Sequence, residues 1–572
     1  TGEDGAAAGE VVGTGQAEGI DTAAVTQRVI SVCRTQLGGR PPVAGIVYAS
    51  IHFDHQLMLN LIGEAFPGMQ LVGCTTAGDY TTAFGFSDDA ITLMTIGIEN
   101  HTTTPIEIGS GIGRGLTGNP EGAAREAVEM ARTHLSGAPR LCLTLPEGYD
   151  IRSEPVLKEM DRRLGAQCSV FGGASGSHWT KDIDIYQFYG REVLTDALPI
   201  LVFSGPVEFT FAIANSWRPV GKRAPVTRSD GRRVERIGEF AAVDFYRHYL
   251  GHHTDPARAF ILAVYEAGSS EAYMRAPIAY NPDGSITFSD PIPQGAEVQL
   301  TEAGRDDLIQ DTQETSQRLA QGITGWVPAF ALAFSCAFRK EVLGTQARQE
   351  LDILKAHLPE RLPIAGFYSF GEIAPLVTGG ETKAHGATLI TLLVGPGSDR
   401  PADDNSETEV TAAVAAVSPE PQAETVFLRR KLLRSEVYRQ RLEIMRDANS
   451  RMHRRIRVEV EAARRRIEEK EAALRKSEEK YRRIVQTTGE GFVLMDEDLN
   501  LIDANDAYCR LVGYPLAELI GNSNLDLASV DFRQYLDANR DLLLADESRR
   551  FEGTIVARDG REVPILAHGN TL

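Results

Sequence analysis

The stretch VAGIVYASIHFDHQLMLNLIGEAFPGMQLVGCTTAGDY (residues 43–80) decides the fold, because it reads as a strand, a helix and a second strand that ends in a glycine-bounded turn. The same order returns between residues 329 and 375, in AFALAFSCAFRKEVLG and later GFYSFGEIAP. A third, shorter copy runs from RLCLTLPE at residue 140 to CSVFGGASGS at residue 168. Strand runs that alternate with helical runs predict an α/β fold of repeated βαβ units with partly parallel strands.

Each copy of the repeat places a glycine-rich turn after its second strand. In α/β folds the loops at the carboxyl ends of parallel strands form the ligand crevice, and glycine lets the backbone approach a ligand closely. One such turn alone is more often only a tight turn, but three equivalent turns that all carry Ser or Thr predict one shared cleft. No turn has the GxxxxGK[ST] pattern of a phosphate loop. The residues expected to contact a ligand are Thr75, Thr76, Gly78, Asp79, Gly172, Gly173, Ser175, Cys336, Arg339, Tyr368, Ser369, Gly371 and Glu372.

A small zwitterion such as an amino acid would need charged partners in this cleft, because burying its charges without them is costly. Arg339 is the expected donor to its carboxylate, and Asp79 and Glu372 are the expected acceptors for its ammonium group. The competing interpretation is an internal ion pair between Arg339 and Glu372 that only holds the fold. Cys336 is a candidate nucleophile. The alternative is a buried structural cysteine, because the sequence identifies no base that would activate the thiol.

Composition and charge exclude several classes of protein. The chain has 572 residues and a formal net charge of −20, which argues against nucleic-acid and anionic membrane partners. Its six cysteines include no CxxC pair, so we expect neither disulfides nor a metal site. No apolar run approaches the roughly 20 residues of a membrane span, and no secretory signal is visible. A multidomain cytoplasmic protein is expected, and because the sequence begins with Thr1 and not Met, it leaves the native start open.

A basic segment, residues 424–480, follows an acidic, proline-containing linker at residues 396–423. Its apolar positions alternate by threes and fours from Tyr438 onward, with a stutter near Ile456 and with Asn449 in one core position. This pattern predicts a parallel dimeric coiled coil that transmits a signal. The alternative is a single solvated helix with charge pairs along its surface.

The turns GCTTAGD and FGGASGS, together with DFYRHYLG (residues 244–251), FSCAFR (334–339) and GFYSFGEIAP, resemble the FIST domain in its amino- and carboxyl-terminal halves. This resemblance implies a sensory module for a small molecule, with amino acids among the proposed ligands. Some members of the family are haem proteins that sense nitric oxide. The candidate haem or metal ligands would be histidines, although no HExxH-type pattern accompanies them; they are His52, His55, His178, His252 and His253.

From Tyr481 the chain resembles a PAS domain that lacks its last strand, with a helix opened by Asn505 and a hairpin at residues 559–560. It has no cysteine where the flavin-binding subclass carries one. The helix expected at residues 531–544 has no histidine that could hold haem. The resemblance therefore implies an unliganded PAS domain that dimerises and relays a signal.

The expected organisation is a flexible tail (1–22), FIST-like amino- and carboxyl-terminal domains (23–240 and 241–395), the linker, the coiled coil and a PAS domain (481–572). We expect a non-catalytic receptor without a cofactor, which binds a small molecule and signals as a homodimer to an output domain beyond residue 572. A histidine kinase or a diguanylate cyclase would be such an output domain. Two alternatives stay open: a haem-based nitric oxide sensor, and an enzyme that uses Cys336 and the three turns.

Overall fold

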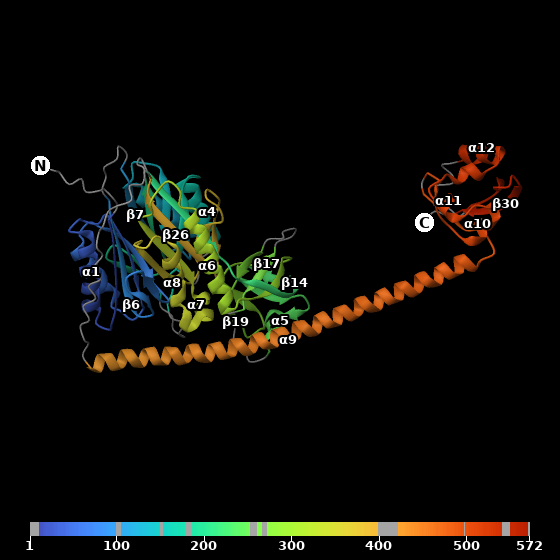
Figure 1. The fold of residues 1–572 in the computed structure, drawn as a ribbon. Coiled ribbons are helices and arrows are strands. Elements are labelled where there is room, and N and C mark those ends of the chain that lie inside the picture. The colour runs from blue at the N-terminus through green and yellow to red at the C-terminus, as the bar shows by residue number, and fades with distance from the viewer. Residues whose placement is uncertain are drawn as a thin grey trace. The chain divides into compact units, whose positions relative to one another are not determined.

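The computed structural model describes residues 11–98, 105–148, 153–177, 185–251, 260–265, 272–397, 421–496, 498–539 and 549–569 (Figure 1). The chain divides into two compact units, Thr1–Ile456 and Arg457–Leu572. The first unit is an α/β body of three repeats, which confirms the predicted fold class. No helix in the described ranges is both long and apolar enough to cross a membrane.

Repeat 1 (residues 11–97) sets the pattern of the body. Its strands β2 and β3 are parallel, the antiparallel strand β6 pairs with β2, and helices α1 and α2 cover one face of the sheet. The predicted tail at residues 1–22 is wrong for its second half, because β1 pairs along its whole length with β6. The elements are β1 (Val11–Glu18), α1 (Thr22–Leu37), β2 (Ala44–Ala49), α2 (His55–Ala65), β3 (Gln70–Thr75), β4 (Asp79–Thr81), β5 (Gly85–Ser87) and β6 (Ala90–Gly97).

Repeat 2 (residues 107–204) has the same order of elements as repeat 1. Its parallel pair is β8 and β9, and β12 is the antiparallel neighbour of β8. The elements are β7 (Glu107–Arg114), α3 (Pro120–Arg132), β8 (Pro139–Thr144), α4 (Ser153–Leu164), β9 (Ser169–Gly173), β10 (Gln187–Tyr189), β11 (Glu192–Leu194) and β12 (Ala197–Ser204).

Repeat 3 (residues 207–396) again has a parallel pair, β22 and β23, with β26 antiparallel to β22. Three helices stand where the other repeats have two. The elements are β13 (Val207–Ala214), α6 (Arg305–Gln321), β22 (Phe330–Cys336), α7 (Ala337–Leu343), the 3₁₀ turn η1 (Gly344–Gln346), α8 (Arg348–His357), β23 (Ile364–Ser369), β24 (Glu372–Pro375), β25 (Thr382–His385) and β26 (Leu389–Pro396).

An insert (residues 218–302) interrupts repeat 3 after β13 and forms a separate eight-stranded sheet with one helix. The predicted domain boundary at residues 240 and 241 falls inside this insert and not between repeats. The elements are β14 (Arg218–Asp230), β15 (Arg233–Ile237), β16 (Phe240–Ala241), α5 (Ala242–Leu250), β17 (Leu262–Tyr265), β18 (Ala272–Arg275), β19 (Pro277–Tyr280), β20 (Ile286–Phe288) and β21 (Glu297–Glu302).

The three repeats exchange strands around a common centre. After its turn, each repeat adds a pair of strands to a neighbouring sheet: β4 and β5 join through β4 to β23, β10 and β11 through β10 to β3, and β24 and β25 through β24 to β9. The inner faces of all three sheets share one apolar core, which contains Tyr48, Phe171 and Phe367 among others. The exchange closes the body into a ring of three sheets, each covered outside by its own helices.

The second parallel strand of each repeat contains one glycine at a position where a side chain would clash with the first parallel strand. A Cβ on Gly73 would lie 2.2 Å from the carbonyl oxygen of Val47, and one on Gly172 would lie 1.9 Å from that of Thr144. Gly366 occupies the equivalent place opposite Ala333. Each parallel pair is therefore too close for any side chain at this position.

Helix α9 (Pro421–Thr487) begins in the first unit and ends in the second. The PAS-like end of the chain has the predicted features: the Asn505 side chain accepts from the Tyr508 N–H and caps α10, and the hairpin at residues 559–560 joins β29 to β30. Its elements are β27 (Val493–Met495), β28 (Leu501–Ala504), α10 (Asp506–Val512), α11 (Leu516–Leu519), η2 (Asn524–Leu527), α12 (Val530–Ala538), β29 (Arg549–Val556) and β30 (Glu562–Gly569).

Candidate functional site

The three glycine-rich turns meet and hydrogen-bond to one another through their backbones, but residues of the first turn do not line the cavity beside the other two. The N–H of Ala77 donates to the carbonyl oxygen of Tyr368 at 3.0 Å, which joins the first turn to the third. The Ala174 N–H donates to Gly371 at 2.8 Å, and the Gly176 N–H donates to Thr75 at 2.9 Å. The exchange of strands between the sheets brings the turns together.

A cavity of about 60 Å³ opens beside the second and third turns, against the insert. Three of the predicted site residues line it: Cys336, Gly371 and Glu372. The remaining wall was not predicted. Phe338 and Phe370 lie within the sequence motifs quoted above, so these motifs could have identified them. No motif pointed to the lining residues of the insert. The unpredicted lining consists of Gly148, Ala174, Ala276, Pro277, Ile278, Ser289, Asp290, Phe338, Phe370, Ile373, Ala384, His385 and Gly386.

The carboxyl group of Glu372 is fully buried beside Cys336. It accepts hydrogen bonds from the Ser369 hydroxyl at 2.6 Å and from the N–H and hydroxyl of Thr388 at 3.1 and 3.0 Å. Burial nevertheless raises the pKa of Glu372 to about 7. Burial also raises the pKa of the Cys336 thiol well above its ordinary range. Cys336 is therefore a protonated thiol at neutral pH, which argues against a nucleophile.

We expect Glu372 to make stability depend on pH between about 4.5 and 7, because in this window the unfolded chain has released a proton that the folded protein keeps. Its contribution to stability falls as pH rises through the window and is constant above it. Relative to the wild type, Glu372→Gln should therefore gain on the order of 3 kcal/mol between pH 4.5 and 7.5. Urea unfolding of both proteins across this range measures the gain. A difference that stays constant with pH would contradict the raised pKa.

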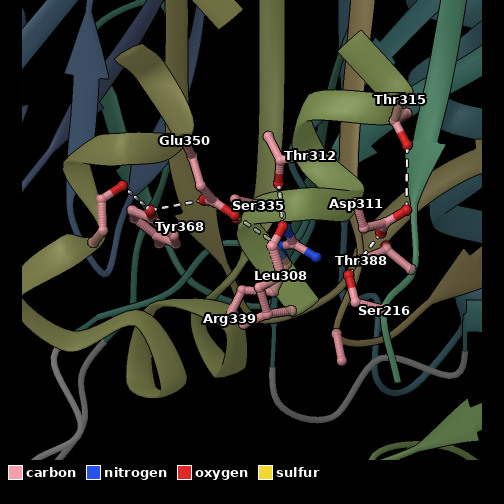
Figure 2. A network of polar contacts seen from close by, with 12 residues as sticks. Ser216, Leu308, Asp311, Thr312, Thr315, Ser335, Arg339, Glu350, Tyr368 and Thr388 are labelled. Atoms are coloured by element: carbon pink, nitrogen blue, oxygen red, sulfur yellow. Dashed lines mark hydrogen bonds and ion pairs between the residues drawn. The ribbon is translucent and has the colours of Figure 1, made fainter. Parts of the chain in front are cut away.

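Arg339 does not line the cavity, and its partner is Glu350 instead of Glu372 (Figure 2). The guanidinium is fully buried and donates from Nε to Glu350 Oε1 at 2.8 Å, and from Nη2 to the Thr312 hydroxyl at 2.8 Å. Glu350 also accepts from the hydroxyl groups of Ser335 and Tyr368, both at 2.8 Å. This network ties α6, α7 and α8 to strands β22 and β23. Arg339 therefore does not face the cavity, and the Arg339–Glu372 pair of the alternative interpretation does not form.

The remaining predicted residues lie in the buried centre of the body. The Asp79 carboxylate accepts from the Thr92 hydroxyl, and burial raises the pKa of Asp79 well above its usual range. The Thr75 hydroxyl accepts from the Tyr186 N–H at 3.0 Å, and the Ser175 hydroxyl donates to the Pro146 carbonyl oxygen at 2.8 Å. Thr76, Gly78, Gly172, Gly173, Tyr368 and Ser369 belong to the same interior and do not line the cavity.

The candidate histidine ligands are only partly within the described residues. His55 is buried, its Nε2 lies 3.0 Å from the Ser50 carbonyl oxygen, and burial lowers its pKa. Burial also lowers the pKa of His52. His178, His252 and His253 lie outside the described residues. Within the described ranges, no three His, Cys, Asp or Glu side chains gather as a metal site would require.

Three family models match the chain. The FIST N domain matches residues 43–239, the FIST C domain matches 242–375, and the PAS fold matches 479–572. No curated protein matches it.

Solved structures similar to parts of the chain include two PAS-type domains. The PAS domain of an HTR-like protein from Haloarcula marismortui has 21% identity and a TM-score of 0.17, and covers 18% of this chain and 84% of its own. A domain of a sensory box sensor histidine kinase/response regulator from Geobacter sulfurreducens has 22% identity and a TM-score of 0.16, covering 17% and 87%. Cyanuric acid hydrolase from A. caulinodans has 8% identity and a TM-score of 0.27, covering 68% and 99%. At these TM-scores none supports an inference about function.

Proposed function

Because the chain carries a FIST N domain, a FIST C domain and a PAS domain, it is a sensory signal-transduction protein, and we propose that the cavity beside Cys336 and Glu372 binds the small molecule it senses. The observation that carries this proposal is the position of the cavity where two of the three converging turns meet the insert. Its wall combines apolar side chains such as Phe338 and Phe370 with a few polar groups, as ligand sites do.

The charges of the wall favour a small amine over an amino acid. The described lining residues include the carboxyl groups of Glu372 and Asp290 and no lysine or arginine. An ammonium group would find acceptors there, whereas an amino acid would also bury a carboxylate without a cationic partner from these residues, which is unfavourable. Arg339, the predicted partner of that carboxylate, is occupied by Glu350.

Isobutylamine and valine test this proposal, because they share a side chain and differ by the carboxylate. In calorimetric titrations of the full chain we expect the amine to bind at least about tenfold more tightly than valine. Ala384→Leu, which fills the cavity, should abolish binding. Lys383→Leu, the half-exposed neighbour on the same strand, is the matched control and should bind like the wild type. Binding of neither compound, or binding that survives Ala384→Leu, would contradict the proposed site.

We further propose that the protein works in the cytoplasm as a homodimer joined through α9 and the PAS domain, and that it signals to an output domain. The apolar stripe of α9 beyond Ile456 supports this, because Val460, Ile467 and Leu474 are each about 60% exposed. Pairing with the same stripe of a second copy would bury them. No catalytic step is assigned to this chain, since the Cys336 thiol stays protonated.

Haem is the alternative ligand that the FIST resemblance implies, and the described residues of the cavity do not fit it. A space of about 60 Å³ is too small for a porphyrin, and His385, the histidine of the wall, has its Nε2 3.0 Å from the Ala374 carbonyl oxygen. A Soret band in the absorption spectrum of the purified full chain would establish haem and replace the amine.

A further inference from the structure

The first half of α9 is docked on its own body (Figure 1). Ala448 and Met452 are buried in the core of the insert, and Met445 and Ile456 pack at its edge. Leu442 lies against Gly344 at the end of α7. These residues continue the apolar stripe that predicted an intermolecular coiled coil, so from Tyr438 to Ile456 the stripe is covered by the chain itself. We call residues 431–456 the strap.

Two ion pairs and one histidine–carboxylate contact, from three parts of the body, hold the strap. Arg434 donates to both carboxylate oxygens of Asp89 in repeat 1, at 2.9 and 2.8 Å. Arg441 pairs with Glu341 of α7, and His453 Nε2 lies 2.8 Å from Glu302 at the end of the insert. The Asp89 side chain is only 1% exposed, so its ion pair with Arg434 is shielded from solvent. The strap therefore bridges repeat 1, repeat 3 and the insert.

Asn449 is poorly satisfied in the docked position. Its side-chain oxygen is buried and has no hydrogen-bond partner among the described residues. The residues from Tyr438 to Ile456 follow strict heptad spacing, and Asn449 takes one core position. In a parallel two-stranded coiled coil, an asparagine in such a position pairs with its copy across the seam. The amide thus lacks in the docked state a partner that a second copy would supply.

Helix α7 places the strap next to the cavity. Cys336 precedes the first turn of α7 and lines the cavity, as does Phe338. Two residues further, the Lys340 ammonium group contacts the Ala77 carbonyl oxygen of the first turn and Asp88, and lies 5.6 Å from the centre of the Tyr438 ring of the strap. A displacement of α7 at the cavity therefore acts directly on the contacts of the strap.

We propose that the strap is releasable, and that the stripe from Tyr438 to Ile456 alternates between its own body and the same stripe of a second copy of this chain. This inference rests on the proposed function in one respect, the dimer joined by α9. Docked, the strap limits the coiled coil to the stripe beyond Ile456. Released, it lengthens the coiled coil by the heptad-spaced residues from Tyr438 to Ile456, which make about five helical turns, and this change in length is the signal passed along α9.

Disulfide trapping in the full chain tests the proposal, in a Cys509→Ser background because the other five native cysteines are buried. One reporter is Met452→Cys, inside the docked stripe, and the other is Ile467→Cys, in the exposed stripe. Each is combined with Arg434→Glu, which places a negative charge against Asp89. The matched control is Arg439→Glu, because Arg439 is exposed and its ion pairs within the described residues are with Glu436 and Glu443 of its own helix.

We expect the disulfide-linked dimer at position 452 to be at least fivefold more abundant with Arg434→Glu than with Arg439→Glu, and the dimer at position 467 to be equal in both. Arg434→Gln, which removes the charge without repulsion, should act in the same direction and verifies that the effect needs no unfolding of the body. Equal trapping at 452 in all variants, with trapping at 467 intact, would overturn the releasable strap and leave the dimer standing. No trapping at either position would overturn the dimer as well.

Discussion

Arg339→Ala is expected to lower the free energy of unfolding of the body by about 3–5 kcal/mol, because it leaves the fully buried carboxylate of Glu350 without its cationic partner. The variant also removes the donor to the Thr312 hydroxyl and therefore loosens α6 from α7. Urea unfolding followed by tryptophan fluorescence measures the loss. The three tryptophans stand at positions 179, 217 and 326, so their signal reports the body alone.

Lys158→Ala is the control for Arg339→Ala. It also removes a cation 2.6 Å from a glutamate, Glu154, but both side chains are more than half exposed. We expect no measurable change in its unfolding, since exposed ion pairs contribute little. A loss for Arg339→Ala no larger than for Lys158→Ala would show that the buried network does not hold the helices. Binding of isobutylamine should persist in any Arg339→Ala protein that remains folded, because Arg339 is not part of the cavity.

Gly172→Ala is expected to destabilise the body by about 3 kcal/mol, the upper end of the cost of overpacking. Its new Cβ would stand 1.9 Å from the Thr144 carbonyl oxygen, so the parallel strands β8 and β9 would have to separate. Urea unfolding measures this loss under the same conditions as the first prediction.

Gly371→Ala is the matched control for Gly172→Ala, since it lies in an equivalent glycine-rich turn. The nearest atom to its added Cβ is 3.8 Å away, and its backbone does not need glycine. We expect its stability to stay within about 0.5 kcal/mol of the wild type. We argue that glycine is required at position 172 because the strands approach closely there, and not because the residue belongs to a glycine-rich turn. Equal losses of stability for the two variants would refute this argument.

The sequence predicted the repeated strand–helix–strand units because their apolar runs are long and the glycine turns align. It failed for β1, where VVGTGQAE looked like a flexible tail. Gly13 and Gly15 there allow α1 to lie against the strand, since a Cβ on Gly15 would stand 2.6 Å from the Val29 carbonyl oxygen. The insert was also missed, because most of its strands are short and its one long strand, β14, is mostly exposed and shows no clear alternation of buried and exposed positions.

The candidate site was predicted only in part, for a physical reason. Cys336, Gly371 and Glu372 were found because they stand at strand ends of the repeat. The partner of Arg339 could not be found, since Glu350 and Thr312 reach it from two different helices and only packing decides that choice. The sequence also revealed the apolar stripe of α9. The spacing of this stripe, however, does not distinguish packing against the body of the same chain from packing against a second copy.

The exchange of strands between the three sheets has a consequence for synthesis on the ribosome. One edge of β3 stays unpaired until β10 has been synthesised, and one edge of β9 stays unpaired until β24 has been synthesised. Strand β4 likewise has no partner sheet until β23, which ends at residue 369. An emerging chain therefore cannot complete its first sheet, or its second, before the next repeat has left the exit tunnel. Until then these edges are exposed templates for pairing with other chains. A fragment cut between the two FIST halves would retain such open edges permanently, so the halves are segments of a single folding unit.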